Sequence, residues 1–273
     1  MGLRLTVSAP AYFLVALLAS ACTTTTTTTV SNEGVSKVTH DRTTRVQEAD
    51  VRTRARARTD LAAGYYRNGQ LAVALEEARR AAAIDATFAD VYGLLGLIYM
   101  DMKVQPDAEA NFQRALKLDP DNSELNNNYG FFLCNTGRVR ESMEYFNRAI
   151  RDPLYATPAR ANQNAGSCLM RIKDYEGAER YLRRSFELDA GLAVPKFLLS
   201  RMYLATGQVD KATFYYNVLA KSVESSAESL WLGLRVARAN ADLRTESQLA
   251  NELRQRFPQS PEAAALARNE FDE

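Results

Sequence analysis

The hydrophobic pattern of this chain repeats at a fixed interval. Gly96 and Gly130 stand 34 positions apart, and so do Phe112 and Phe146. Self-similarity at a period of this size indicates stacked units, each of which buries its apolar face against the next. Pro120 ends the second helix of its unit because proline cannot continue the helical hydrogen-bond ladder. The pattern therefore predicts pairs of helices and no strands.

An interval of 34 residues is that of the tetratricopeptide repeat, a helix-turn-helix unit. In this frame Gly96 lets the second helix approach the first closely, and Tyr99 and Phe112 fill the space between them. The same frame fits Ala62, Tyr65, Ala74 and Ala81 upstream, and Gly166, Leu169, Ala178, Ser185, Ser200, Tyr203, Ala212, Tyr216 and Leu219 downstream. A weaker unit covers residues 229–258, as expected of a terminal repeat that faces solvent on one side. We therefore predict an all-α, right-handed superhelix of about six repeats over residues 51–273.

The first helix of each repeat lines the concave face of such a superhelix. The side chains expected there are Leu94, Leu97, Asn127, Asn128, Phe131, Gln163, Asn164, Arg171, Phe197 and Arg201. Amide groups can satisfy the backbone of a bound chain without selecting a charge, so this mixture suits an extended or helical peptide. Three consecutive asparagines at residues 126–128 also lower helix propensity, at a cost that packing alone does not explain. We predict a partner-binding groove; the alternative is a solvated concave wall.

Two cysteines, Cys134 and Cys168, are also 34 positions apart, on first helices of adjacent repeats. These helices are neighbours, so a disulfide is geometrically possible, and it would contribute about 3–4 kcal/mol to the free energy of unfolding in the chain-entropy model. The alternative is that two small buried residues never pair. Two cysteines without a nearby histidine do not favour zinc, and we expect no metal site.

The first 21 residues have the pattern of a secretory signal: Arg4, an apolar run over residues 11–18, and small residues before Cys22. A cysteine in this place resembles that of a bacterial lipoprotein signal, although Ala19 stands where that pattern usually has leucine. The resemblance implies cleavage before Cys22 and its acylation, with palmitate or similar chains that together anchor a protein stably. Threonine rather than aspartate at residue 23 implies the periplasmic face of the outer membrane. The alternative is an ordinary signal peptide that leaves a free cysteine.

Residues 22–50 are polar, lack a clear period and begin with a run of threonines. Such a run cannot bury apolar surface, so we expect a disordered tether between the anchor and the repeats. The repeat domain then opens with Arg52, Arg54, Arg56 and Arg58. We expect these arginines to lie on a solvated first helix; contact with anionic lipid or an acidic partner is the alternative.

Composition and motifs exclude several classes of function. The net charge is +1, and no aromatic residues interleave with the arginines for base stacking, so we expect no nucleic-acid partner. The single histidine, His40, lies in a polar stretch without the enclosed surroundings that a general base needs. Repeats occupy nearly all of the chain after residue 50, and no phosphate loop, paired carboxylates or nucleophile motif occurs. We expect no enzyme activity, no small-molecule substrate and no cofactor beyond the covalent lipid on Cys22.

The combination of a lipoprotein-type signal with six such repeats resembles the PilF/PilW family. The stretch NNNYGFFLCNTGR, which contains Asn128 to Cys134, and the second cysteine in NAGSCL carry the more specific part of the resemblance. The resemblance implies a pilotin of type IV pilus biogenesis, an outer-membrane scaffold that binds the secretin subunit and promotes its localisation and multimer assembly. It also implies that Cys134 and Cys168 pair. The alternative is another outer-membrane repeat lipoprotein, an accessory of barrel assembly or of a cell-wall synthase.

Overall fold

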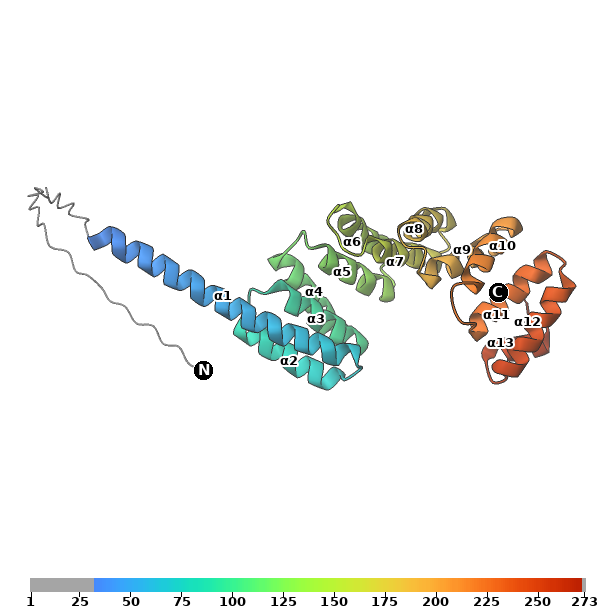
Figure 1. The fold of residues 1–273 in the computed structure, drawn as a ribbon, viewed down its shortest axis with the longest axis horizontal. Helices are drawn as coiled ribbons and strands as arrows, with labels where there is room; N and C mark the ends of the chain where they lie inside the picture. The colour runs from blue at the N-terminus through green and yellow to red at the C-terminus, as the bar shows by residue number, and fades with distance from the viewer. Residues whose placement is uncertain (1–31, 272–273) are drawn as a thin grey trace, which may run out of the picture. The chain divides into compact units, whose positions relative to one another are not determined.

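A computed structural model of the chain describes the backbone of residues 32–271 and the side chains of residues 47–271. Over these residues it contains thirteen α-helices and no strand (Figure 1). The helices are α1 (Asn32–Arg67), α2 (Leu71–Ile84), α3 (Ala89–Asp101), α4 (Gln105–Leu118), α5 (Ser123–Asn135), α6 (Val139–Arg151), α7 (Pro158–Arg171), α8 (Tyr175–Leu188), α9 (Ala193–Ala205), α10 (Val209–Ala220), α11 (Ala227–Ala239), α12 (Leu243–Arg256) and α13 (Pro261–Arg268). The repeats lie in one compact unit, Glu48–Glu273.

The helices from α3 onward pack in successive pairs: α3 with α4, α5 with α6, α7 with α8, α9 with α10, and α11 with α12. The first helices of adjacent pairs, α3, α5, α7, α9 and α11, also pack against one another in order. With α1 and α2 as the first pair, this confirms an all-α tetratricopeptide-repeat fold of six pairs. Helix α13 lies beyond the six predicted helix pairs. This helix begins 34 residues after α11 and packs on α11 and α12, in the place of the first helix of a seventh repeat.

Close approach of the paired helices depends on small residues, as predicted. A Cβ atom on Gly96 would lie 2.7 Å from the ring of Phe112, and one on Gly130 would lie 3.0 Å from the ring of Phe146. Both rings are almost completely buried. Ser200 holds the same position in the fifth repeat, and its hydroxyl donates to the carbonyl oxygen of Ala212 at 2.9 Å. The second, third and fifth pairs are thus each held together by a tight contact at the same repeat position.

Helix α1 begins at Asn32, so residues 32–50 are helical rather than the tether that their polar sequence predicts. These residues lack a clear hydrophobic period, which is the sequence signal for a packed helix. Once residues 51–67 are helical, however, each added residue gains a backbone hydrogen bond without a new nucleation step. A polar segment can therefore extend a helix that packing has already nucleated. The structure does not describe residues 1–31.

The arginines at the start of the repeat domain bind partners within the protein. Arg52 donates to the carboxylate of Asp85 and to the hydroxyl of Thr87, and Arg58 pairs with Glu77 of α2. The remaining two are Arg54, which pairs with Asp50, and Arg56, which lies over the ring of Phe88. Burial by itself raises the pKa of Asp85, but hydrogen bonds from Thr87 and Arg52 hold it below the ordinary value. Arg52, Arg56 and Arg58 therefore join α1 to α2 and to the loop before α3, whereas Arg54 pairs within α1. The prediction of a solvated first helix did not include these contacts.

Candidate partner-binding site

A cavity of about 430 Å³ lies along the first helices of the third and fourth repeats. It is lined by Glu124, Asn127, Asn128, Thr157, Arg160, Gln163, Asn164 and Leu192. We call it the amide cavity, because four of these side chains carry carboxamides. Those four, Asn127, Asn128, Gln163 and Asn164, were all predicted to line the groove. They meet because α5 and α7 pack side by side and carry them at matching repeat positions.

The amides of the cavity are joined in a short hydrogen-bonded chain. Asn164 donates from Nδ2 to Oδ1 of Asn127 at 3.1 Å, and Asn127 donates from Nδ2 to Oδ1 of Asn128 at 3.4 Å. Asn127 is buried, whereas Asn128, Gln163 and Asn164 are half-buried. Because a carboxamide offers two donor hydrogens and two acceptor lone pairs, the half-buried amides retain groups that can bond a ligand backbone.

The amide cavity also carries one side chain of each charge. Glu124 belongs to the first turn of α5 and Arg160 to the first turn of α7. Tyr155 donates from its hydroxyl to Oε2 of Glu124 at 3.1 Å. Burial raises the pKa of Tyr155, and the negative charge of Glu124 raises it further, so the phenol stays a neutral donor. The balance of charges and amides suits a peptide backbone rather than a strongly anionic or cationic ligand.

The third asparagine of the run, Asn126, has a different role. It is fully buried and donates from Nδ2 to the carbonyl oxygens of Pro120 and Asn122, both at 2.8 Å. The same repeat position holds Asn162 and Lys196, which donate to carbonyl oxygens of Pro158 and Ala190 near the starts of their helices. The propensity cost at Asn126 is therefore explained by packing, and only the other two asparagines of the run line the cavity.

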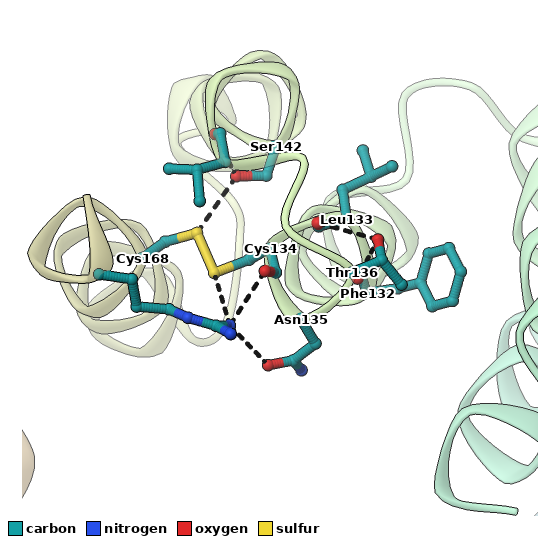
Figure 2. The surroundings of a disulfide bond; sticks show 9 residues. Phe132, Leu133, Cys134, Asn135, Thr136, Ser142 and Cys168 are labelled. Atoms are coloured by element: carbon teal, nitrogen blue, oxygen red, sulfur yellow. Dashed lines mark hydrogen bonds between the residues drawn. A yellow bond between two sulfur atoms is a disulfide. The ribbon is translucent and has the colours of Figure 1, made fainter. Parts of the chain in front are cut away.

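Cys134 of α5 and Cys168 of α7 form a disulfide, with sulfur atoms 2.02 Å apart and Cα atoms 5.9 Å apart (Figure 2). The hydroxyl of Ser142 lies 3.4 Å from the sulfur of Cys168. The bond crosslinks the two helices that carry the amides of the cavity. It lies toward their C-terminal ends, whereas Glu124 and Arg160 lie at their N-terminal ends.

Arg171 does not line the amide cavity, although we had placed it in the groove. It donates from Nη1 to the carbonyl oxygen of Cys134 at 2.9 Å and to Oδ1 of Asn135 at 3.2 Å. The last carbonyl groups of a helix lack partners within that helix, so an arginine from the neighbouring helix stabilises them. Arg171 thus reinforces the contact between α5 and α7 beside the disulfide.

The other predicted groove residues lie apart from the amide cavity. Leu94 is buried, and Leu97 is half-buried and packed against the core of the first repeats. Arg201 lies over the ring of Phe197, 5.9 Å from its centroid. Phe131 is 37% exposed and lines a different cavity. Of the ten predicted groove residues, four therefore line the amide cavity.

This second cavity, of about 340 Å³, lies at the C-terminal ends of α3 and α5. Its lining is Met100, Asp101, Lys103, Gln105, Phe131, Phe132, Asn135 and Thr136. Tyr66 donates to Oδ2 of Asp101 at 2.8 Å. Burial and the neighbouring carboxylate together raise the pKa of Tyr66.

Besides the four predicted amides, the cavity is lined by Glu124 and Arg160, which lie on the same first helices, and by Thr157 and Leu192. Thr157 and Leu192 are the N-cap residues of α7 and α9 and lie in loops, outside the helical positions used for the prediction. Their place one residue before a first helix is the signal that could have found them. In the part of the chain that the structure describes, no helix is long and apolar enough to cross a membrane, and no three metal-binding side chains gather. Cys22 and the side chain of His40 lie outside the described residues.

Comparison with known proteins agrees with the fold. Tetratricopeptide-repeat family models match residues 89–122, 111–144 and 159–191. The type IV pilus assembly protein PilF of Pseudomonas aeruginosa is 27% identical over 202 residues, 74% of this chain and 80% of PilF. The crystal structure of PilW, a widely conserved type IV pilus biogenesis factor, is 32% identical, with a TM-score of 0.74 over 78% of this chain and 98% of PilW. A structure of PilF from P. aeruginosa is 26% identical, with a TM-score of 0.73 over 80% of this chain and 99% of PilF.

The fold and the amide cavity define a tetratricopeptide-repeat protein, a class that mediates protein–protein interactions. Near-complete coverage of PilW at 32% identity narrows the class further. The chain belongs to the PilF/PilW family of type IV pilus biogenesis proteins.

Proposed function

We propose that this protein is a pilotin, which binds the type IV pilus secretin subunit and promotes its localisation and multimer assembly at the outer membrane. Membership of the PilF/PilW family supports a role in pilus biogenesis. The observation that carries the proposal of binding is the amide cavity, where Asn128, Gln163 and Asn164 are half-buried on adjacent first helices. A secretin segment in extended or helical form is the proposed ligand.

The chemistry of the cavity supports recognition of a polypeptide. Amides can both donate to carbonyl groups and accept from N–H groups of a bound backbone. Glu124 and Arg160 offer one charge of each sign to polar side chains of the segment. The disulfide between Cys134 and Cys168 and the bond from Asn164 to Asn127 hold the two walls in one arrangement. A preformed site lowers the ordering cost of binding.

Anchoring at the periplasmic face of the outer membrane is the second part of the proposal. Its support is the lipoprotein-type signal that ends before Cys22. Acyl chains on that cysteine would hold the repeat domain near the site where the secretin ring assembles. The role is that of a scaffold: it needs no catalysis and no cofactor other than the lipid.

The test measures secretin multimers in outer-membrane fractions by semi-native gel electrophoresis. Five strains are compared: the intact strain, a strain that lacks the gene, and strains that carry Cys22→Ala, the double change Asn128→Ala with Gln163→Ala, or Gln248→Ala. Gln248 is an exposed amide on α12, outside the amide cavity, and serves as the matched control. Immunoblots establish that every variant is present in equal amount.

Multimers should vanish without the gene, be mislocalised or scarce with Cys22→Ala, decline with the double change, and stay normal with Gln248→Ala. Normal multimers in all strains would refute the pilotin proposal, and the partner would then be sought among barrel-assembly and cell-wall proteins. If multimers are lost without the gene but are normal with the double change, the protein acts on the secretin without using the amide cavity.

A further inference from the structure

The residues that follow α13 turn back onto α11 of the sixth helix pair. The ring of Phe271 stacks on that of Trp231 in α11, with centroids 5.2 Å apart and ring planes 12° apart. The guanidinium carbon of Arg238 lies 3.8 Å from the centroid of the Phe271 ring. One phenylalanine side chain therefore contacts an indole and a guanidinium group at once.

A helix cap directs the chain to this place. Helix α13 ends at Arg268 and is capped by Asn269, whose φ of 56° is the left-handed conformation that often terminates helices. The backbone N–H of Glu270 then donates to the carbonyl oxygen of Ala265 at 3.0 Å, and Arg268 pairs with Glu270 at 2.8 Å. This turn brings Phe271 against α11.

Trp231 occupies the repeat position that lines the concave face in other repeats. It follows Phe197 by 34 residues and Gln163 by 68, and Gln163 lines the amide cavity. In the fifth repeat the corresponding aromatic residue, Phe197, likewise lies beside an arginine, Arg201. The concave face therefore changes from amides in the third and fourth repeats to aromatic residues and arginines in the fifth and sixth.

The contacts of Phe271 define the chemistry that this surface accepts. A flat aromatic ring can stack on the indole and can bind the guanidinium group through its electron-rich face. Arg238 also pairs with Glu246 at 3.6 Å, and Glu270 pairs with Arg268, so these charges are already matched within the protein. The group that occupies the site is thus a single aromatic ring.

We propose that Trp231 and Arg238 form an aromatic-acceptor subsite of the concave face, and that Phe271 fills it as an internal competitor of a partner segment that carries an aromatic residue. A tethered competitor acts at an effective concentration in the millimolar range. A partner segment with the same chemistry therefore binds weakly unless it also gains contacts elsewhere on the concave face. Phe271 therefore raises the affinity that a partner needs in order to occupy the subsite, and this favours partners that contact the concave face at more than one point.

The experiment uses Trp231 as the reporter, because it is the only tryptophan in the chain. Its emission and its quenching by acrylamide are measured in the full-length protein, in Phe271→Ala and in the conservative variant Phe271→Tyr. Each protein is then titrated with a pentapeptide that matches residues 269–273 and with the same peptide carrying alanine in place of its phenylalanine. The titration is repeated with Arg238→Gln in the Phe271→Ala background.

Phe271→Ala should expose Trp231 to quenching, and Phe271→Tyr should leave it shielded. The phenylalanine peptide should bind Phe271→Ala about tenfold or more tightly than it binds the wild type, because the tethered competitor is gone. The alanine peptide should not restore the shielding of Trp231. Arg238→Gln should weaken the peptide about fivefold, as expected for one lost cation–π contact.

Unchanged quenching in Phe271→Ala, equal binding of the two peptides, or equal binding to wild type and Phe271→Ala would each overturn the proposal. The test involves no secretin, so its outcome is separate from that of the pilotin proposal.

Discussion

Asn164 of α7 donates a hydrogen bond across 3.1 Å to Asn127 of α5, and both residues line the amide cavity. This bond belongs to the packing of two adjacent repeats and to the wall of the candidate binding site at the same time. A change at either residue therefore affects the stability of the repeats as well as any ligand. Variants that test binding should spare this pair, and variants that test packing should target it.

We predict that Asn164→Ala lowers the free energy of unfolding by about 1–2 kcal/mol, because it removes the donor to Oδ1 of the buried Asn127. Gln163 is the neighbouring half-buried residue and takes no part in this hydrogen bond. Gln163→Ala should therefore change the free energy of unfolding by less than about 0.5 kcal/mol. Urea unfolding followed by circular dichroism measures both values. Equal losses in the two variants would contradict a structural role for the bond.

The disulfide between Cys134 and Cys168 should stabilise the central repeats. Replacing both cysteines by serine should lower the free energy of unfolding by about 3 kcal/mol, since the bond closes a loop of 34 residues in the unfolded chain. Reductant should destabilise the wild-type protein by a similar amount and leave the double variant unchanged. If the unfolding curve of the wild-type protein is the same with and without reductant, the disulfide contributes nothing to the free energy of unfolding.

Most of the fold could be predicted from the sequence because each packing contact recurs one period later. Gly96 with Phe112 and Gly130 with Phe146 are two copies of the same contact, so the spacing alone identified the helix pairs. Half of the amide cavity could be predicted for the same reason. Asn127 and Gln163 lie at the same position of adjacent repeats, and that position faces the concave surface.

The contacts that escaped prediction have no periodic copy. Arg52 reaches Asp85 across 33 residues, and Phe271 reaches Trp231 from beyond the last helix pair. Each depends on the path of one loop or turn. The asparagine run was misinterpreted for a different reason. Helix propensity does not distinguish Asn126, a buried side chain that donates to the loop before α5, from Asn128, which lines the cavity.

Two glycines on first helices should respond to alanine in opposite directions. Gly96→Ala places a Cβ 2.7 Å from Phe112 and should destabilise the protein by about 1–3 kcal/mol through overpacking. Gly64→Ala, in α1, meets nothing nearer than 4.0 Å and should stabilise it by about 0.5–1 kcal/mol through helix propensity. Thermal unfolding of both variants tests the pair. If Gly96→Ala also stabilises the protein, the ring of Phe112 can move aside without a cost in free energy.

The last prediction concerns pH and the carboxylate of Glu109 on α4. Hydrogen bonds from Arg138, and a further one from Tyr129 at 3.1 Å, hold the pKa of Glu109 below its ordinary value, against the opposing effect of burial. A carboxylate whose pKa is lower in the folded state stabilises that state above its unfolded pKa of about 4.3. This contribution is lost as the pH falls through the lower, folded pKa.

We therefore expect Glu109→Gln to be less stable than the wild type at pH 7, by about 1 kcal/mol because the ion pair is partly exposed. The gap should narrow as the pH falls below about 4, where the wild-type carboxylate also becomes neutral. Urea unfolding at pH 7 and pH 3 measures this difference in the free energy of unfolding. The contributions of the other carboxylates cancel in the difference because both proteins contain them. Glu144→Gln, which removes an exposed ion pair with Arg148 within α6, is the matched control and should cost less than about 0.5 kcal/mol. A gap that persists undiminished at pH 3 would show that Glu109 acts through packing rather than through its charge.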